Sequence, residues 1–331
     1  MSLKTEHIVK LLQLKSIGRS TLNKLLNVKF SRQIINDKDL SDFLNFAYHD
    51  KLIPNLQNYS SSDITTAFRK GNDILELSEK LGITIIPNNH PDFPQLLHLI
   101  DDPPIILNFI GDYKQLNQKH SVAVIGATKP TPEGLLSSEF FGQLLGKNDF
   151  NVLSNLSFGC ASAAVRGAIN KLGFTTALLA QGLHSVFSKE YKSLADEIIS
   201  NGGLLMSEYF VGTNQLPDYF VERNRLLIGL AFALILIQSD SNDSILQLLN
   251  TAYRNNKLLA AVKYKIKLDS ENISGNELLI NKYKAFPLTS NNAPEFIRLL
   301  KNKVRPIPNL IPSRSNRKED PVYLKDDYSQ E

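Results

Sequence analysis

The spacing of apolar residues along the chain changes near residue 82. Before this point apolar residues recur every three or four positions, as in Ile8, Leu11 and Leu12, which is the spacing of amphipathic helices. After it, short β-branched or aliphatic runs alternate with helical stretches. Six runs are predicted to be strands, over residues 121–125, 151–154, 175–180, 204–207, 233–237 and 258–262. Strands that alternate with helices predict a parallel sheet, whose ligands bind beyond the carboxyl ends of the strands.

The same change of pattern predicts three parts. Residues 1–81 form a small helical domain, residues 82–303 form a Rossmann-like α/β domain with a doubly wound, mostly parallel sheet, and residues 304–331 form a tail. The tail combines prolines with mixed charges and few apolar residues, which is typical of disorder. Residues 15–21 resemble the hairpin of a helix-hairpin-helix (SAM-like) domain, whose amides face a phosphate. A plain corner between two helices explains these residues equally well.

Composition excludes several classes of protein. The only cysteine is Cys160, the six histidines are scattered, and the net charge is +4. Neither a disulfide framework nor a zinc site is expected. The longest apolar run, residues 226–237, contains a glycine and is too short to span a bilayer. The first ten residues lack the apolar core of a secretion signal, so a cytoplasmic protein without membrane contact is expected.

The loop after the first predicted strand has the residues of an anion site. Gly126 ends the strand and allows a ligand to approach the backbone, while Thr131 and Pro132 are typical of the start of a helix. The amides of the new helix and Lys129 would attract a phosphate. The GxGxxG signature of dinucleotide-binding proteins is absent. A phosphate site and a plain strand–helix turn both remain open.

Two further segments bear on function. Cys160 precedes a helix of small residues over 161–169 and is expected to be a buried, unreactive thiol. Arg223, Asn224 and Arg225 are predicted to begin an apolar helix, where arginines oppose the helix dipole unless an anion sits there. The alternative is that Arg225 pairs with an acid, Glu208 or Glu222, and only shapes the site.

Five stretches, in this order, resemble the motifs of one family. They are Phe93-Pro94 with Asp102-Pro103-Pro104, residues 126–134, residues 203–209 with Gly212-Thr213, Phe220 with residues 223–225, and residues 274–276 with Leu279-Ile280. Together they resemble the DprA/Smf (DNA-processing protein A) family over about residues 84–300. The resemblance implies a protein that binds single-stranded DNA without sequence preference and helps load a RecA-type recombinase during natural transformation. It also implies a homodimer, expected to form near Leu279 and Ile280, and no cofactor. The sequence shows no metal cluster and no paired acid and base, so no nuclease or nucleotide hydrolase activity is expected.

The chain departs from the family pattern at charged positions. The arginine of the family's GSR motif is Thr128 here, and the glycine, arginine and aspartate of its SGLARGID stretch are Asn155, Phe158 and Ala161. The loss of two arginines should weaken DNA binding unless nearby lysines compensate. The DNA site is predicted to comprise Gly126, Thr128, Lys129, Gly159, Arg166, Lys189, Arg223, Asn224, Arg225 and Lys263.

Two other functions remain open on the sequence. One is a nucleotide-binding sensor or nucleotide-processing enzyme on the same fold, for which Glu208 is the single well-placed carboxylate. The other is a diverged interaction module that binds DNA weakly, which the missing arginines favour.

Overall fold

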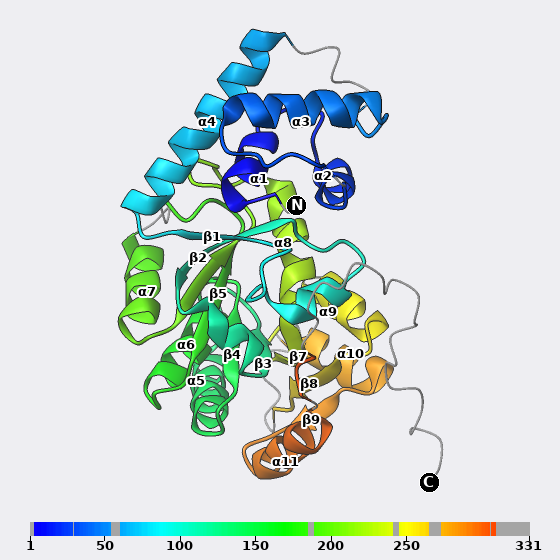
Figure 1. Cartoon of the computed structure of the whole chain (residues 1–331). Coiled ribbons are helices and arrows are strands. Elements are labelled where there is room, and N and C mark those ends of the chain that lie inside the picture. The colour runs from blue at the N-terminus through cyan, green and yellow to red at the C-terminus, as the bar shows by residue number, and fades with distance from the viewer. Residues whose placement is uncertain are drawn as a thin grey trace.

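A mostly parallel sheet runs through the protein, and helices from the N-terminal part of the chain cover one end of it (Figure 1). The computed structural model describes residues 3–28, 30–53, 60–184, 189–240, 245–264, 273–304 and 306–308. Most of the expected disordered tail therefore lies outside the described residues. Within the described ranges, no helix is both long enough and apolar enough to cross a membrane.

The N-terminal part is helical, as the spacing of its apolar residues predicts. Its helices are α1 (Thr5–Leu11), α2 (Arg19–Leu26), α3 (Asp37–His49) and α4 (Ser61–Lys80). Asn36 and Ser60 start α3 and α4 with reciprocal side-chain and backbone hydrogen bonds. The apolar faces of these helices share one core, which also includes Ile105 and Ile106 next to the sheet. The helices are therefore packed onto the sheet.

Nine strands form a single sheet within the described residues. They are β1 (Thr84–Pro87), β2 (Ile106–Gly111), β3 (Ser121–Ile125), β4 (Asn151–Ser154), β5 (Thr175–Leu179), β6 (Leu204–Ser207), β7 (Ala231–Leu236), β8 (Leu258–Val262) and β9 (Phe286–Leu288). Their order is β1-β2-β6-β5-β4-β3-β7-β8-β9. Only β2 runs antiparallel to its neighbours, β1 and β6, and the other pairs are parallel. The direction of strand succession reverses between β3 and β7.

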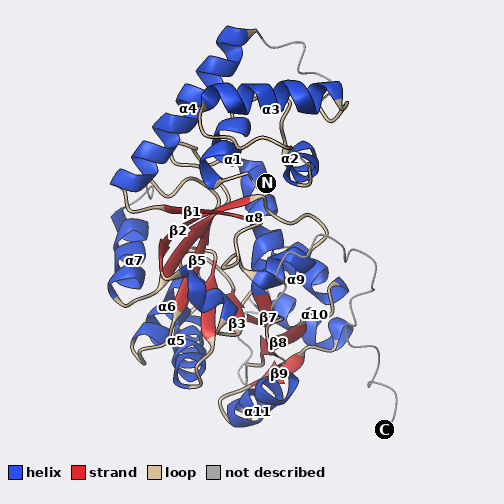
Figure 2. Ribbon diagram, in the orientation of Figure 1, coloured by secondary structure: helices blue, strands red, loops and turns tan. Residues whose placement is uncertain are grey.

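Helices cover both faces of the sheet (Figure 2). They are α5 (Pro132–Lys147), α6 (Cys160–Ile169), α7 (Lys189–Ser200), α8 (Pro217–Leu230), α9 (Ile245–Arg254), α10 (Ser274–Tyr283) and α11 (Ala293–Lys303). Alternate residues of β3 enter different cores: Val122 and Val124 pack with α5, α6 and α11, whereas Ala123 and Ile125 pack with α8, α9 and α10. The predicted doubly wound α/β fold is thereby confirmed.

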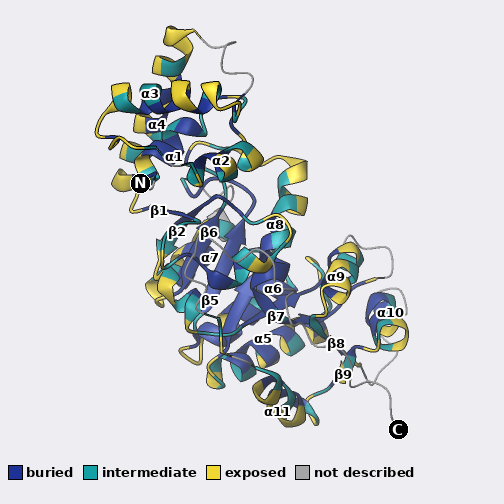
Figure 3. Ribbon diagram, turned by 45° about the vertical axis from the view of Figure 1, so that its right-hand side comes forward, coloured by how far each residue is buried: buried dark blue, intermediate teal, exposed yellow. Residues whose placement is uncertain are grey.

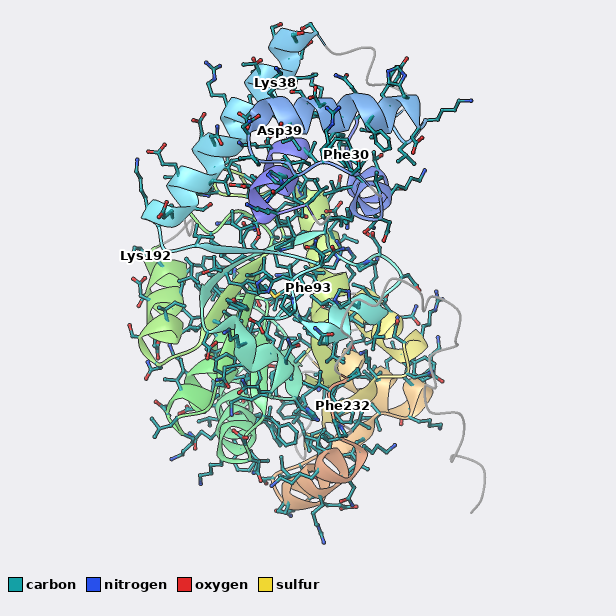
Figure 4. The ribbon with its side chains drawn as sticks, viewed as in Figure 1. Phe30, Lys38, Asp39, Phe93, Lys192 and Phe232 are labelled. Carbon is teal, nitrogen blue, oxygen red and sulfur yellow. The ribbon has the colours of Figure 1, made fainter. Side chains whose placement is uncertain are left out.

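Burial follows this layered arrangement (Figure 3). The strands at the centre are buried, and the exposed residues lie on the outer sides of the helices. Phe93 is fully buried, whereas Lys192 projects from the outer side of α7 (Figure 4). Leu279, expected near a dimer interface, is also fully buried in the chain's own core, and Ile280 packs against that core.

All six predicted strands are present, with end points shifted by one or two residues at β5 and β7. β1, β2 and β9 were not predicted. β1 and β9 are edge strands of four and three residues, and each contains a proline. β2 has six residues and lies between β1 and β6, but Asn108 interrupts its apolar run.

Candidate nucleic-acid interface

The carboxyl ends of the parallel strands bring several distant loops to one edge of the sheet. The loop after β3 lies between the loop after β4 and the end of β7, because β4 and β7 are the two neighbours of β3. In doubly wound sheets the crevice for a ligand opens where the strand order reverses, which here is between β3 and β7. The predicted loop at Gly126 is therefore at the position where this fold binds ligands.

Gln238, which follows β7, holds the β3–α5 loop in place. Its carbonyl accepts a hydrogen bond from the amide of Ala127 at 2.7 Å, and its side-chain Oε1 accepts one from the amide of Thr131 at 2.9 Å. Gln238 is 1% exposed. The loop is thus fixed at both ends. Between these ends, the amides of Thr128 and Lys129 have no hydrogen-bond partner within the described residues, and both residues are exposed.

Gly126 is needed for packing in this loop. A Cβ atom at Gly126 would lie 2.8 Å from Sγ of Cys160 and 3.1 Å from the carbonyl oxygen of Gln238. The sequence predicted that a ligand approaches Gly126 closely, whereas in the structure Cys160 and Gln238 make this close approach. Thr131 and Pro132 begin α5 as predicted: the hydroxyl of Thr131 accepts a hydrogen bond from the amide of Gly134 at 3.2 Å.

Gly159 locks the β4–α6 loop against the β3–α5 loop. Its φ of +72° lies in the region that favours glycine, and a Cβ atom here would collide with the carbonyl oxygens of Ala127 and Thr128. The next amide, that of Cys160, donates a hydrogen bond to the carbonyl of Ala127 at 3.1 Å. The two loops consequently form one rigid surface, from which Lys129 extends into solvent.

Arg223 lies beneath this surface. The helix that carries it, α8, begins at Pro217, so the prediction that Arg223, Asn224 and Arg225 start a helix is wrong. The signal for the true start was present, because proline favours the first helical position. Arg223 is 6% exposed, and its Nη1 donates hydrogen bonds to the carbonyls of Asn155 at 3.1 Å and Leu178 at 3.3 Å.

These contacts tie the carboxyl ends of β4 and β5 to α8. The Nε of Arg223 donates a third hydrogen bond to Oδ1 of Asn224 at 3.2 Å. Burial lowers the pKa of Arg223 to about 10, because removing a cation from water disfavours its charged form. The structure therefore places Arg223 and Asn224 as supports of the edge.

Arg225 points toward a group of charges at the N-terminal helices. Its Nη2 donates hydrogen bonds to both carboxylate oxygens of Glu208, at 2.7 and 2.5 Å, and its Nε lies 3.3 Å from Oδ2 of Asp102. Arg19 of α2 reaches the same acids, with Nη1 at 2.6 Å from Asp102 and 3.5 Å from Glu208. We call Arg19, Asp102, Glu208, Glu222 and Arg225 the Glu208 cluster.

The Glu208 cluster matches the alternative in which Arg225 forms a structural ion pair. Burial raises the pKa of Glu208 above its ordinary value, although Arg225 and Arg19 oppose this shift. Arg19 comes from the predicted hairpin region, which the sequence analysis could not connect with any other part of the chain. It reaches Glu208, 189 residues away in the chain, only because the N-terminal helices pack beside α8.

The remaining predicted cations are not gathered in one place. Lys263 is exposed directly after β8, at the same edge as Lys129. Lys189 begins α7, which follows β5, and its side chain lies outside the described residues. Arg166 is in the last turn of α6, toward the opposite edge, and its Nε pairs with Glu197 at 3.1 Å.

Asn276 gives the motif at residues 274–276 a structural explanation. Its Nδ2 donates hydrogen bonds to the carbonyls of Ile237 at 2.6 Å and Val262 at 3.0 Å, and its Oδ1 accepts one from the amide of Ser239 at 3.0 Å. These bonds join the carboxyl ends of β7 and β8. The buried amide side chain therefore shapes the same edge of the sheet from the other side of β3.

The site shows no arrangement suited to catalysis by a thiol or a metal. Burial raises the pKa of Cys160 to about 11, so its thiolate is scarce at neutral pH. The described residues contain no group of three or more histidine, cysteine, aspartate or glutamate side chains that could hold a metal ion. The edge instead offers exposed amides and a lysine on a rigid base, which suits the binding of an anion.

Fold and site together define a Rossmann-like α/β protein with exposed amides and a lysine at the carboxyl edge of its sheet. The family model of the DNA recombination-mediator protein A matches residues 84–298, well over half of the chain. The chain therefore belongs to this family, which confirms the resemblance to DprA/Smf proteins.

Curated relatives include the DNA processing protein DprA of Streptococcus pneumoniae, 33% identical over 147 residues, which are 44% of this chain and 51% of that protein. DprA of Bacillus subtilis is 27% identical over 195 residues, 56% of this chain and 65% of that protein. Protein Smf of Synechocystis is 29% identical over 168 residues, 50% of this chain and 42% of that protein. The chain thus spans about half the length of the curated relatives that it matches.

Two solved structures have the same fold. DprA of S. pneumoniae superposes with a TM-score of 0.68 at 24% identity, covering 89% of this chain and 98% of that one. DprA of Helicobacter pylori superposes with a TM-score of 0.58 at 25% identity, covering 67% of this chain and 97% of that one. The latter structure is described as showing a single-stranded DNA binding mode of the H. pylori protein.

Proposed function

We propose that this chain binds single-stranded DNA through the carboxyl edge of its sheet. The observation that carries the proposal is the exposed segment Thr128–Lys129 on the rigid β3–α5 loop, at the point where the strand order reverses. Two amides that no described residue accepts a hydrogen bond from, together with a lysine, are complementary to a phosphate. Family membership and the DNA-binding H. pylori relative support the same ligand.

The candidate residues take different roles in this proposal. Lys129 and the amides of Thr128 and Lys129 contact phosphates, with Lys189 and Lys263 flanking them along the edge. Gly126, Gly159, Arg223 and Asn224 hold the loops in position from below. Arg225 does not contact a phosphate in this proposal, because it is paired within the Glu208 cluster. Arg166 does not contact one either, because it lies toward the opposite edge of the sheet.

The test is the salt dependence of binding by Lys129→Ala. Each phosphate contact on a single strand contributes roughly −0.7 to the slope of log affinity against log salt concentration. We expect Lys129→Ala to flatten the slope by about 0.7 and to weaken binding to all sequences alike. The matched control is Lys171→Ala, which removes an exposed lysine between α6 and β5, at the opposite edge.

If Lys129→Ala and Lys171→Ala bind an oligonucleotide with the same affinity and slope, the β3–α5 loop is not the DNA site. If the parent protein itself fails to bind, the interaction-module reading replaces this one. Both comparisons require that each variant melts at the same temperature as the parent protein. This is expected because both lysines are exposed.

The wider activity is also part of the proposal. We propose that the chain acts without catalysing a reaction, as a cytoplasmic homodimer that delivers single-stranded DNA to a RecA-type recombinase, and that transformation is the setting. Sedimentation at micromolar concentration tests the dimer. A nuclease or nucleotide hydrolase activity that Glu208→Gln abolishes would overturn the non-catalytic role.

A further inference from the structure

Phe158 presents an aromatic ring at the carboxyl edge of the sheet. It lies in the β4–α6 loop and is 38% exposed. Its ring stacks on Tyr191 of α7, with 3.9 Å between ring centroids and 22° between ring planes. The ring is therefore held in one orientation by a second aromatic ring.

A contact of the next residue fixes the loop that carries this ring. Gly159 packs against the carbonyls of Ala127 and Thr128. The exposed ring consequently stands on the same rigid surface as Lys129. Part of the apolar surface of Phe158 thus remains exposed next to the candidate phosphate contact, although Tyr191 stacks on the ring.

We propose that Phe158 is a stacking platform for one unpaired base of single-stranded DNA. The inference rests on the proposed function and names the part of the ligand that this position recognises. Aromatic side chains bind bases through their faces, and such contacts tolerate any sequence because every base has a π-face. A base next to a phosphate held at Lys129 would meet the ring, since both belong to adjoining loops.

The proposal also explains the departure at this position. Where the family pattern has an arginine, the chain has a ring supported by Tyr191. An ionic contact to the DNA backbone is thereby replaced by a contact between the ring of Phe158 and a base. In a duplex the faces of the bases are covered by their neighbours, so the platform favours single strands over double strands.

The experiment compares two ligands of equal length: an oligodeoxythymidine and a deoxyribose-phosphate chain without bases. Both carry the same phosphates, and only the first has bases. We expect Phe158→Ala to weaken binding of the oligodeoxythymidine by about 5- to 100-fold and to leave binding of the abasic chain unchanged. Lys129→Ala should weaken both. The control is Phe140→Ala on α5. Phe140 is 40% exposed, which matches Phe158, but it lies about 12 Å along α5 from the carboxyl edge of the sheet.

A second measurement reports the contact directly. The chain contains no tryptophan, so Phe158→Trp introduces a single indole whose fluorescence reports on this position alone. We expect the oligodeoxythymidine to quench this fluorescence and the abasic chain to leave it unchanged. Phe140→Trp should respond to neither ligand.

The outcomes separate the two proposals. If the parent binds both ligands and Phe158→Ala binds the oligodeoxythymidine like the parent, stacking at this position is refuted while the phosphate site stands. An unquenched Phe158→Trp that still binds the oligodeoxythymidine leads to the same conclusion. If the parent binds neither ligand, the DNA-binding function fails, and the platform fails with it.

Discussion

Removal of the Glu208 carboxylate should destabilise the protein, because it leaves a largely buried arginine without its principal partner. The side chains of Glu208 and Arg225 are 12% and 20% exposed, and two hydrogen bonds of 2.7 and 2.5 Å join them. Breaking a buried pair by removing one partner costs about 3–5 kcal/mol. Asp102, 3.3 Å from Nε of Arg225, remains as a second partner, although its side chain is 55% exposed.

We therefore expect Glu208→Ala to lower the free energy of unfolding by about 2–4 kcal/mol, the lower end reflecting the remaining ion pair with Asp102. In a chain of this size this corresponds to a fall in melting temperature of about 4–12 °C. Circular dichroism during heating measures the change. The matched control is Glu76→Ala, which breaks the exposed Lys80–Glu76 pair and should shift melting by no more than about 2 °C.

A double variant tests directly whether the ion pair between Glu208 and Arg225 is structural. Glu208→Leu combined with Arg225→Met removes both charges and should be more stable than Glu208→Ala, because no unpaired buried cation is left. Should Glu208→Ala melt like Glu76→Ala, or the double variant be no more stable than Glu208→Ala, the ion pair is not structural. Arg225 would then be available to a phosphate, as the sequence analysis first suggested.

Two other predictions concern buried titratable groups. Burial raises the pKa of Cys160 to about 11, so at pH 8 a thiol reagent should modify the folded protein at least about 100-fold more slowly than a free cysteine, and rapidly in denaturant. Fast modification of the folded protein would show that the thiol is accessible. Lys257 is half-buried with Nζ 3.5 Å from the carbonyl of Gly229, and burial lowers its pKa to about 8. Because the folded state binds this proton less tightly than the unfolded state does, the charge costs stability below pH 8, and the cost disappears as pH rises toward the unfolded pKa. Lys257→Met should therefore stabilise the protein by about 1–3 kcal/mol at pH 7, with a gain that shrinks above pH 8 and is nearly absent by pH 10.5. An equal gain at both pH values would contradict this explanation.

Elements that depend on neighbours in sequence were predicted well. The start of α5 followed from Thr131 and Pro132, and β3, β4, β6 and β8 followed from short runs of apolar residues. The start of α8 was missed, although Pro217 signals it, because proline favours the first helical position. Phe158 was noted only as a missing arginine, since nothing near it in sequence shows that Tyr191 supports its ring.

The sequence by itself determined that strands and helices alternate after residue 82, that the loop after β3 begins a helix, and that the part of the chain before residue 82 contains helices. These features arise from hydrogen bonds and side-chain spacing within a few residues. Only the tertiary structure decided which loops share an edge and which charges pair. Arg225 meets Glu208 and Asp102, and Gln238 meets Thr131, across long separations in the chain. Which of the available partners a buried polar group takes depends on packing that brings distant segments together, and spacing along the chain does not contain that information.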